Sequence, residues 1–427
     1  MQTLRFSNEA GGADATRSST LTAQQKVKSK EDAIPLAGIA GVAVAGFCSF
    51  LNLYATQPLL PMLVDSFHAT KAEVSLTVSA ASLAVACSAP FIGVFSDRVG
   101  RKNVIIPAIF LLVIPTLMAA AAPGVFELVA CRFLQGLILP AVFAVTLAYV
   151  CEEWSKHGLG AALSLYVASN VVGGFSGRLI TGLVAASYGW RHAFIVLAIM
   201  EVIGGFLAWR LLPASKNFKA RVDHTNMFAT IRMLLRDQRL VASFAVGFNI
   251  LFSLVATFTF ITFHLSAPPY SLDVRSLSLL FTVYLVGAIS TPYAGRFIDS
   301  MGFKQTLLLA MAVSVSGVLL TLVPNLHVIL AGLTISCSSL FLCQSATQTS
   351  LRKFASLHTS AAAGLYVCFY YLGGSLGGFL PSLAWDAGGW TACVALVVSC
   401  HLLAMGCAFK FWHFEKMVPA NYQLDVR

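Results

Sequence analysis

The sequence predicts an all-α integral membrane protein with twelve transmembrane helices in two pseudo-symmetric six-helix halves. Apolar residues make up 57% of the chain and charged residues only 11%, whereas soluble proteins carry about a quarter charged residues. Charge-poor runs of about 20 residues recur, each long enough to cross about 30 Å of hydrocarbon as a helix. These runs are continuous rather than alternating, which argues against strands. Two motifs of the first half also return in the second.

The longer repeat is separated by about 200 residues. Residues 161–190 and 361–390 align without a gap and share Leu-Tyr-Val, Gly-Gly, a single Gly and Gly-Trp at the same positions. The shorter repeat reads G-x-x-x-D-x-x-G-x-K at 93–102 and again at 295–304. A membrane chain of two similar halves is typical of secondary transporters, with the substrate site between the halves.

We predict six spans before a basic stretch and six after it. The first six cover about 36–63, 73–95, 104–122, 126–151, 161–186 and 191–212. The last six cover about 240–264, 275–296, 305–323, 326–350, 361–385 and 390–412. The predicted parts are a polar disordered tail (1–34), an N-terminal bundle (35–212), a basic cytoplasmic linker (213–239), a C-terminal bundle (240–412) and a cytoplasmic tail (413–427).

Lys and Arg predict the orientation. With the N-terminus inside, nearly all of them fall on inner segments, so the net charge of +10 is a topology signal. Both termini are expected in the cytoplasm, with the protein in a bacterial-type inner (plasma) membrane. A nucleic-acid partner would need a basic face on a soluble domain, and the sequence offers none.

Several kinds of chemistry are not expected. The ten cysteines lie inside spans or at their ends without paired spacing, which argues against disulfides and a zinc site. The chain has no GxxxxGK[ST] phosphate loop and no nucleophile–base spacing, so neither an ATP motor nor an enzyme is predicted. We expect no cofactor and no metal. The expected partners are a small-molecule substrate, protons and the lipid bilayer, with the protein as a monomer.

Particular motifs carry a family resemblance. GVFSDRVGRK at 93–102, between spans 2 and 3, resembles the signature loop of the major facilitator superfamily. RFLQG at 132–136 resembles that superfamily's RxxQG motif, and the stretches 169–182 and 256–272 resemble its drug- and arabinose-efflux branch. The resemblance covers all twelve spans and implies a secondary transporter. The substrate does not follow, because function lives in sites rather than in folds.

The resemblance implies a latch at the inner membrane boundary. Asp97 is expected to meet the start of span 11, near 360–363, where the helix dipole favours an anion by about 0.3–1 kcal/mol. The motif's first glycine is expected to let helices approach closely. Arg101 would pair with Glu152 or Glu153, and the latch would break on inward opening. The alternative is that these charges serve only the positive-inside rule. The latch candidates of this copy are Gly93, Asp97, Arg98, Gly100, Arg101, Lys102, Glu152 and Glu153.

The second copy of the motif departs from the first. Phe303 stands where the first copy has Arg101, and Arg352 and Lys353 stand two hundred residues after the two glutamates. Asp299 is therefore expected to pair directly with Arg352 or Lys353. The two latches would then be built differently.

In the superfamily, spans 1, 4, 7 and 10 line the cavity, and here each carries polar side chains at helical spacing. Ordinary hydrogen bonds between helices, worth about 0.6 kcal/mol each, are the alternative reading. Nearby aromatic side chains would suit an apolar or aromatic substrate, or simply pack. The predicted substrate-binding residues are Asn52, Tyr54, Thr56, Gln135, Asn249, Ser253, Thr257, Gln344, Gln348 and Tyr370.

Three charged residues that lie away from the ends of predicted spans are candidates for proton coupling. In the family, the arginine at the position of Arg132 is tied to this role. Arg178 lies about 12 Å from the outer surface by helix rise and Glu201 lies at a similar depth, and such charges are usually paired or functional. We expect Arg178 and Glu201 to pair. A carboxyl group in apolar surroundings has a raised pKa and can carry a proton. A purely structural ion pair is the alternative.

The sequence therefore predicts an exporter of small organic molecules (a drug, a sugar or a metabolite) that works by alternating access and proton antiport. Two alternatives stay open. A proton-coupled importer of a sugar or organic acid has the same fold, and a non-transporting receptor could use the same scaffold.

Overall fold

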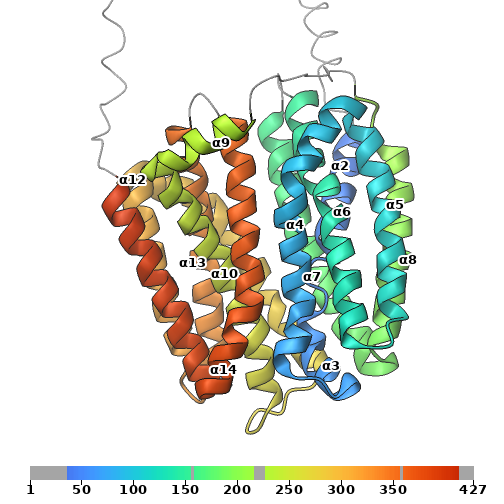
Figure 1. Ribbon diagram of the computed structural model, residues 1–427, viewed down its shortest axis with the longest axis vertical. Helices are drawn as coiled ribbons and strands as arrows, with labels where there is room; N and C mark the ends of the chain where they lie inside the picture. The colour runs from blue at the N-terminus through green and yellow to red at the C-terminus, as the bar shows by residue number, and fades with distance from the viewer. Residues whose placement is uncertain (1–35, 155–157, 216–226, 356–358, 413–427) are drawn as a thin grey trace, which may run out of the picture.

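The computed structural model describes residues 36–154, 158–215, 227–355 and 359–412. Both predicted tails, and residues 216–226 of the predicted linker, lie outside these ranges. Within them every regular element is a helix (Figure 1). We call the end of the bundle at α3 and α11 the outer end and the opposite end, at α9, the inner end. The N-terminal half holds α2 (Leu36–Leu51), η1 (Gln57–Leu59), α3 (Leu60–Phe67), α4 (Lys71–Val99), α5 (Arg101–Ala120), α6 (Val125–Glu153), α7 (Leu159–Tyr188) and α8 (Trp190–Leu211).

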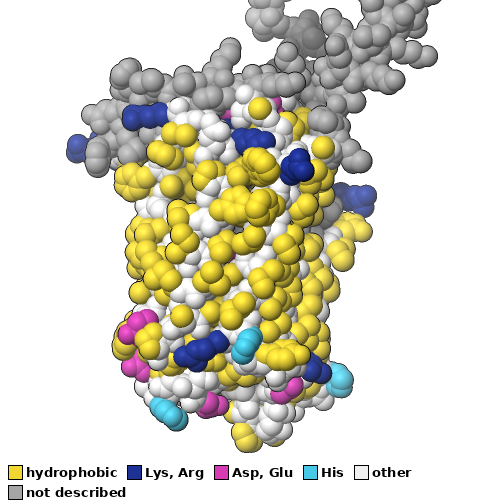
Figure 2. All heavy atoms as spheres, turned by 90° about the vertical axis from the view of Figure 1, so that its right-hand side faces the viewer, with side chains coloured by type: hydrophobic (Ala, Val, Ile, Leu, Met, Phe, Trp, Pro, Cys, Tyr) yellow, Lys and Arg dark blue, Asp and Glu magenta, His cyan; other side chains and the backbone are white. Residues whose placement is uncertain are grey.

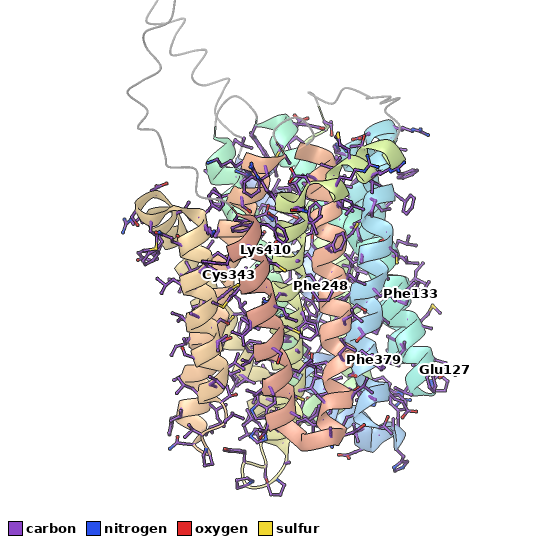
Figure 3. All side chains as sticks on the ribbon, turned by 60° about the vertical axis from the view of Figure 1, so that its left-hand side comes forward. Glu127, Phe133, Phe248, Cys343, Phe379 and Lys410 are labelled. Atoms are coloured by element: carbon purple, nitrogen blue, oxygen red, sulfur yellow. The ribbon has the colours of Figure 1, made fainter. Side chains whose placement is uncertain are left out.

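The second half follows the same course. It holds α9 (Met227–Arg236), α10 (Gln238–Ser266), α11 (Val274–Leu279), η2 (Leu280–Thr282), α12 (Val283–Leu320), α13 (Leu326–Phe354) and α14 (Thr359–Phe411). Two of these helices consist of two arms, because α12 turns at Gly302 and α14 turns at Gly388 and Gly389. Figure 3 shows the result for α14, with Phe379 nearer the outer end and Lys410 near the inner end.

By length and composition, ten helices of the described residues can cross a membrane. One of these stretches, Ala361–Phe411, contains both arms of α14, and the first apolar helix, Ala37–Leu51, is shorter than the others. The count of twelve crossings therefore stays a prediction. Figure 2 shows a face whose middle is hydrophobic and whose charged side chains lie toward the two ends, as a bilayer requires.

Helix starts follow ordinary capping chemistry at the membrane boundaries. Thr70 and Glu73 form a capping box at the start of α4. Asn325 accepts hydrogen bonds from two backbone N–H groups at the start of α13. Asp273 caps α11 by accepting from the backbone N–H of Ser276, and the hydrogen bonds from Ser276 hold the pKa of its carboxyl below the ordinary value.

Repeated glycines set the closest helix contacts in each half. A Cβ at Gly177 of α7 would lie 1.8 Å from the carbonyl oxygen of Leu51, and a Cβ at Gly377 of α14 would lie 2.4 Å from that of Phe252. The glycine four residues earlier in each helix makes the same approach one turn away. Only glycine permits such contact between backbones. The sequence repeat therefore encodes equivalent packing of α7 on α2 and of α14 on α10.

The first predicted span, 36–63, is interrupted. Helix α2 ends at Leu51, and residues 52–56 form turns before η1 begins. The interruption frees backbone carbonyls, so that Arg132 donates to Leu53 O and the Thr181 hydroxyl donates to Ala55 O at 2.8 Å. Irregular backbone at membrane depth is tolerated where protein groups satisfy it.

Helix α9 lies within the predicted linker. Its Leu234 is buried in a cluster with Leu240, Phe244, Leu351 and Tyr366, so α9 covers the inner ends of α10, α13 and α14 (Figure 1). Helix α10 starts at Gln238, slightly before the predicted boundary at 240. This part of the linker is therefore attached to the C-terminal half.

The two halves meet at the outer end and the centre. At the outer end the Lys71 ammonium lies 5.1 Å from the Trp385 ring centre. Deeper in, the Gln57 side chain donates to Thr259 Oγ1 at 3.0 Å. Near the centre the rings of Phe143 and Tyr371 stack at 5.7 Å. These contacts place residues of η1, α6, α10 and α14 at one interface.

Candidate functional site

The predicted inner latch centres on Arg101, the buried first residue of α5. Its guanidinium donates to Glu152 twice, from Nε to Oε2 at 3.0 Å and from Nη2 to Oε1 at 2.6 Å. Nη2 also lies 2.6 Å from Oδ1 of Asp97, and Nη1 donates to Ser96. Bidentate arginine–carboxylate bonds are among the strongest polar contacts. Arg101 therefore ties together the inner ends of α4, α5 and α6.

Two glycines of the motif play different parts. Gly100 has φ 99°, a conformation that favours glycine, and it forms the corner between α4 and α5. The prediction of close helix approach at Gly93 is wrong, because a Cβ there would meet no described atom within 4 Å. The neighbouring rings of Phe91 and Phe95 are exposed, so this end of α4 faces open space.

The expected contact of Asp97 with the start of α14 stays a prediction. Residues 356–358 and the side chains of 359 and 360 lie outside the described part of the chain. The described partner of Asp97 is Arg101. Arg98, beside it, is exposed at the inner end.

In the second copy of the motif, aromatic side chains make the contacts between helix ends. Phe303 lies 5.4 Å from Trp412 and 5.8 Å from Phe354, and the Lys353 ammonium lies 5.7 Å from the Phe303 ring centre. Within the described residues no ion pair joins Asp299 to Arg352, one of its two predicted partners, so that pairing is wrong. With phenylalanine in place of the central arginine, aromatic packing links these helix ends instead, and Asp299 is exposed.

The motif lysines, in contrast, act alike in both halves. Lys102 donates to the carbonyl oxygen of Leu212 at the end of α8, and Lys304 donates to that of Phe409 at 2.8 Å. Figure 3 places the adjacent Lys410 at this inner end of α14. A cation there complements the carbonyl end of the helix. Each motif therefore fastens the last helix of its own half.

A buried carboxyl group forms the core of the N-terminal half. Glu201 of α8 is fully buried and accepts hydrogen bonds from the Asn52 amide and from Thr116 Oγ1, the latter at 3.2 Å. Gln135 donates to the same Thr116 hydroxyl at 2.8 Å. The network therefore joins the turn after α2 with α5, α6 and α8 around one ionisable group.

Arg132 extends this network toward the interrupted helix. It is fully buried, and it donates to Gln135 and to the carbonyls of Leu53 and Thr77, the last at 3.1 Å. It also lies near enough to Glu201 for electrostatic attraction. Gln135 and Thr116 together link the arginine to the acid, and no direct ion pair joins the two among the described residues.

Arg178 lies elsewhere, at the boundary between the halves. Its Nε donates to Gln57 Oε1 at 2.7 Å and its Nη1 to Gly174 O at 2.8 Å. Its guanidinium also faces the rings of Tyr54, Phe281 and Tyr284, with centres 4.9, 5.0 and 4.7 Å away. Two of these rings belong to the C-terminal half.

The predicted Arg178–Glu201 pair is therefore wrong. Both residues are buried, but they point to different places. Glu201 faces α2 and α5 inside the N-terminal bundle, while Arg178 faces η2 and α12 across the interface. Sequence distance gives depth along a helix, whereas pairing depends on rotation about its axis.

The predicted substrate-binding residues separate into groups. Asn52 and Gln135 belong to the Glu201 network, and Ser253 belongs to a matching network in the second half. Gln344 accepts from Tyr366, on which Tyr370 stacks, and Gln348 is half-buried. Polar atoms without a hydrogen-bond partner among the described residues mark the remaining four, which are Tyr54, Thr56, Asn249 and Thr257. Such atoms call for water or a ligand.

His401 of α14 was missed as a member of a network. Its Nδ1 lies 3.2 Å from Ser253 Oγ and its Nε2 lies 3.1 Å from Ser314 Oγ. The signal was present in the sequence, since His401 follows Glu201 by the offset of the repeat. Thr116, Phe281 and Tyr284 had no comparable signal.

Comparison with known proteins decides the family. The family model described as the Major Facilitator Superfamily matches residues 42–377. The chain belongs to the major facilitator superfamily. Proteins of this superfamily are transporters, and this chain is a multi-pass membrane transporter of that type.

Its relatives in the superfamily agree. The inner membrane transport protein YnfM of Escherichia coli is 31% identical, over 84% of this chain and 87% of its own length. An uncharacterized MFS-type transporter of Bacillus subtilis, YybF, is 30% identical over 84% and 90%. Among solved structures, the nucleoside transporter NupG has a TM-score of 0.73 at 12% identity, covering 88% of this chain and all of that one. That likeness shows the fold alone.

Proposed function

We propose that this transporter exports small organic molecules by alternating access and exchanges them for protons. The observation that carries the proposal is the buried Glu201 carboxyl group in its network with Asn52 and Thr116. An ionisable acid inside a membrane bundle is costly and marks a proton pathway by default. Export rests on the resemblance of the stretches 169–182 and 256–272 to efflux permeases.

The charge distribution supports the proposed orientation. Basic side chains gather at the inner end, and the positive-inside rule assigns that end to the cytoplasm. YnfM carries the words inner membrane in its name, which supports the same location here. The described basic residues of that end include Arg98, Arg101, Lys102, Arg232, Arg236, Arg239, Arg352 and Lys353.

The geometry supports a defined role for each group. A proton on Glu201 removes the negative charge that attracts Asn52 and Arg132. Asn52 begins the interruption between α2 and η1, and Tyr54, two residues on, lies at the interface between the halves. Protonation therefore changes the forces on the same backbone turn that reaches the interface. At the inner end the Arg101 latch stabilises one state of the cycle.

Inverted membrane vesicles with a preformed pH gradient test the proposal. Addition of a substrate, found by thermal-shift screening of a compound library, is expected to dissipate the gradient in wild-type vesicles. The Glu201→Gln variant is expected to bind the same compound without moving protons. A transport rate that is unchanged by an uncoupler would contradict proton coupling. Accumulation of substrate inside intact cells would overturn export in favour of import.

The receptor alternative finds no support, because the named relatives are transporters. Counterflow of radiolabelled substrate in liposomes separates the two functions directly. A receptor would bind without exchange.

A further inference from the structure

The Arg178 side chain has unused hydrogen-bonding capacity. It is 4% exposed, and an arginine carries five N–H donors. The described residues accept from two of them, through Gln57 and Gly174. One N–H on Nη1 and both on Nη2 are left for other acceptors. Buried donors are normally satisfied, so this fork is suited to a ligand.

The charge of Arg178 is also unmatched. No carboxylate among the described residues lies within ion-pair distance of its guanidinium, whereas Arg101 contacts both Asp97 and Glu152. Buried charges in membrane proteins are normally paired with one another or serve a substrate. A planar guanidinium fork fits a carboxylate through two parallel hydrogen bonds.

The surroundings of Arg178 are aromatic and come from both halves. Tyr54 belongs to the first half, and Phe281 and Tyr284 to the second. Beyond Tyr54, the Tyr371 ring stacks on Phe143 and meets Tyr370 edge to face at 5.5 Å. Flat rings pack against such walls through stacked or edge contacts.

Two hydroxyls complete the polar side of this place. Those of Tyr54 and Ser82 lie close together, and neither makes a hydrogen bond of normal geometry with a described residue. A ring hydroxyl or the second oxygen of a carboxylate could use them.

The internal repeat shows that the fold does not require this arginine. The equivalent position in α14 is Gly378, where a Cβ would lie 2.4 Å from Ser79 Oγ, so α14 packs tightly on α4. Both positions face the opposite half, but only one carries a charge. Gly378 therefore serves helix packing, whereas the charge of Arg178 is not needed for packing and is available for binding.

We propose that Arg178, with Tyr54 and Tyr284, forms the binding site for a small aromatic carboxylate, which is the transported substrate. This inference rests on the proposed transport function and names its substrate class. The carboxylate would lie on the free edge of the guanidinium, with its ring against the aromatic walls and both halves in contact with one molecule.

Equilibrium binding to the purified full-length protein in detergent tests the site. The probes are benzoate, salicylate and the neutral benzamide, measured by titration calorimetry. Wild type is expected to bind one of the two acids at least about tenfold more tightly than benzamide. Arg178→Gln is expected to lose at least about tenfold in affinity for that acid, and Arg178→Lys to lose less, because it keeps the charge without the fork.

Arg191→Gln is the matched control. Arg191 also lies over a ring, that of Trp190 at 4.3 Å, and donates to a backbone carbonyl at 2.9 Å, but it is exposed at the outer end. Its removal is expected to leave acid binding unchanged. If Arg178→Gln elutes as aggregate, Arg178→Met replaces it, since an apolar side chain adds no buried polar group of its own.

Three results would overturn the site: no binding of either acid to wild type, equal binding of benzamide, or unchanged acid binding in the Arg178 variants. The proposed function fails separately. If acid binding depends on Arg178 but no protons move in inverted vesicles, the proposal of proton antiport is wrong and the proposed binding site stands. If a neutral compound drives proton movement equally in wild type and in Arg178→Gln, proton antiport stands and the proposed binding site is wrong.

Discussion

In the N-terminal half, Glu201 of α8 accepts hydrogen bonds from Asn52, in the turn after α2, and from Thr116 of α5. At the equivalent place in the C-terminal half, His401 of α14 contacts Ser253 of α10 and Ser314 of α12. Glu201 and His401 correspond by the 200-residue offset of the longer repeat, yet one network is built around an acid and the other around an imidazole. Both ionisable groups are fully buried.

The same contrast recurs elsewhere between the halves. Arg101 corresponds to Phe303 and Arg178 to Gly378, while the packing glycines and the motif lysines are retained. The halves therefore agree where backbones touch and helix ends are fastened, and they differ where charge is placed. Under the proposed function, the shared positions serve packing and the N-terminal half carries most of the chemistry.

The largest effect is expected at the shared packing positions. Gly177→Ala and Gly377→Ala each force a Cβ onto a backbone carbonyl and should destabilise the fold by more than about 3 kcal/mol, because neither backbone can move aside easily. Folded yield and thermal unfolding in detergent measure this. Gly160→Ala in α7 and Gly364→Ala in α14 are matched controls, since a Cβ there meets no described atom within 4 Å. Equal behaviour of test and control variants would contradict the role of the repeat.

The next effect concerns the two buried networks. Glu201→Gln should abolish proton-driven transport and flatten its pH dependence, because the amide cannot take up a proton, while substrate binding stays. His401→Gln keeps polar contacts with its serines and should retain coupled transport. Flux in proteoliposomes across an imposed pH gradient measures both. If the histidine variant loses coupling and the glutamate variant keeps it, the assignment of chemistry to the first half is reversed.

A smaller effect separates the two latches. Asp97→Asn should strongly reduce transport without loss of membrane insertion, because it weakens the Arg101 cluster. Asp299→Asn should be close to wild type, since no ion pair with Arg352 is present among the described residues. In a charge swap, Arg101→Glu should be defective and the added Glu152→Arg should restore part of the activity. A double variant no better than the worse single one argues that the two side chains do not act as a pair.

The smallest effect is expected at the motif lysines. Lys102→Met and Lys304→Met each remove a cation from a helix C-terminus and should cost about 0.3–1 kcal/mol, by the same amount in both halves. Thermal unfolding of the single and double variants measures this. Additive losses are expected because the lysines lie in different halves. A loss in only one half would mean that the second motif no longer fastens its helix.

The sequence predicted the parts of the fold that depend on composition and periodicity. The helical segments fall near their predicted ranges, because long apolar runs in a membrane chain leave few alternatives. The interruption at 52–56 was not predicted, because no proline or glycine lies within those residues and its carbonyls are satisfied by distant side chains, those of Arg132 and Thr181.

The candidate site was predicted less well than the fold. The latch residues around Arg101 were identified by their motif, whose spacing determines their geometry. The partners of Arg178 and Glu201 were not, because helix rotation decides which neighbour a buried charge meets. The significance of His401 also depends on three-dimensional context, since a single histidine in an apolar run resembles a structural residue until its serine partners are seen.

The short turn at 52–54 has a thermodynamic consequence. Asn52 touches the acid at one end, and Tyr54 lies under the Arg178 guanidinium at the other. If protonation of Glu201 changes the dissociation constant of the ligand by some factor, ligand occupancy must change the proton affinity of Glu201 by the same factor. A tenfold effect would correspond to a coupling free energy of about 1.4 kcal/mol between two sites that are three backbone residues apart. Measuring ligand affinity as a function of pH, or proton affinity as a function of ligand concentration, would then give the same coupling free energy between the two sites.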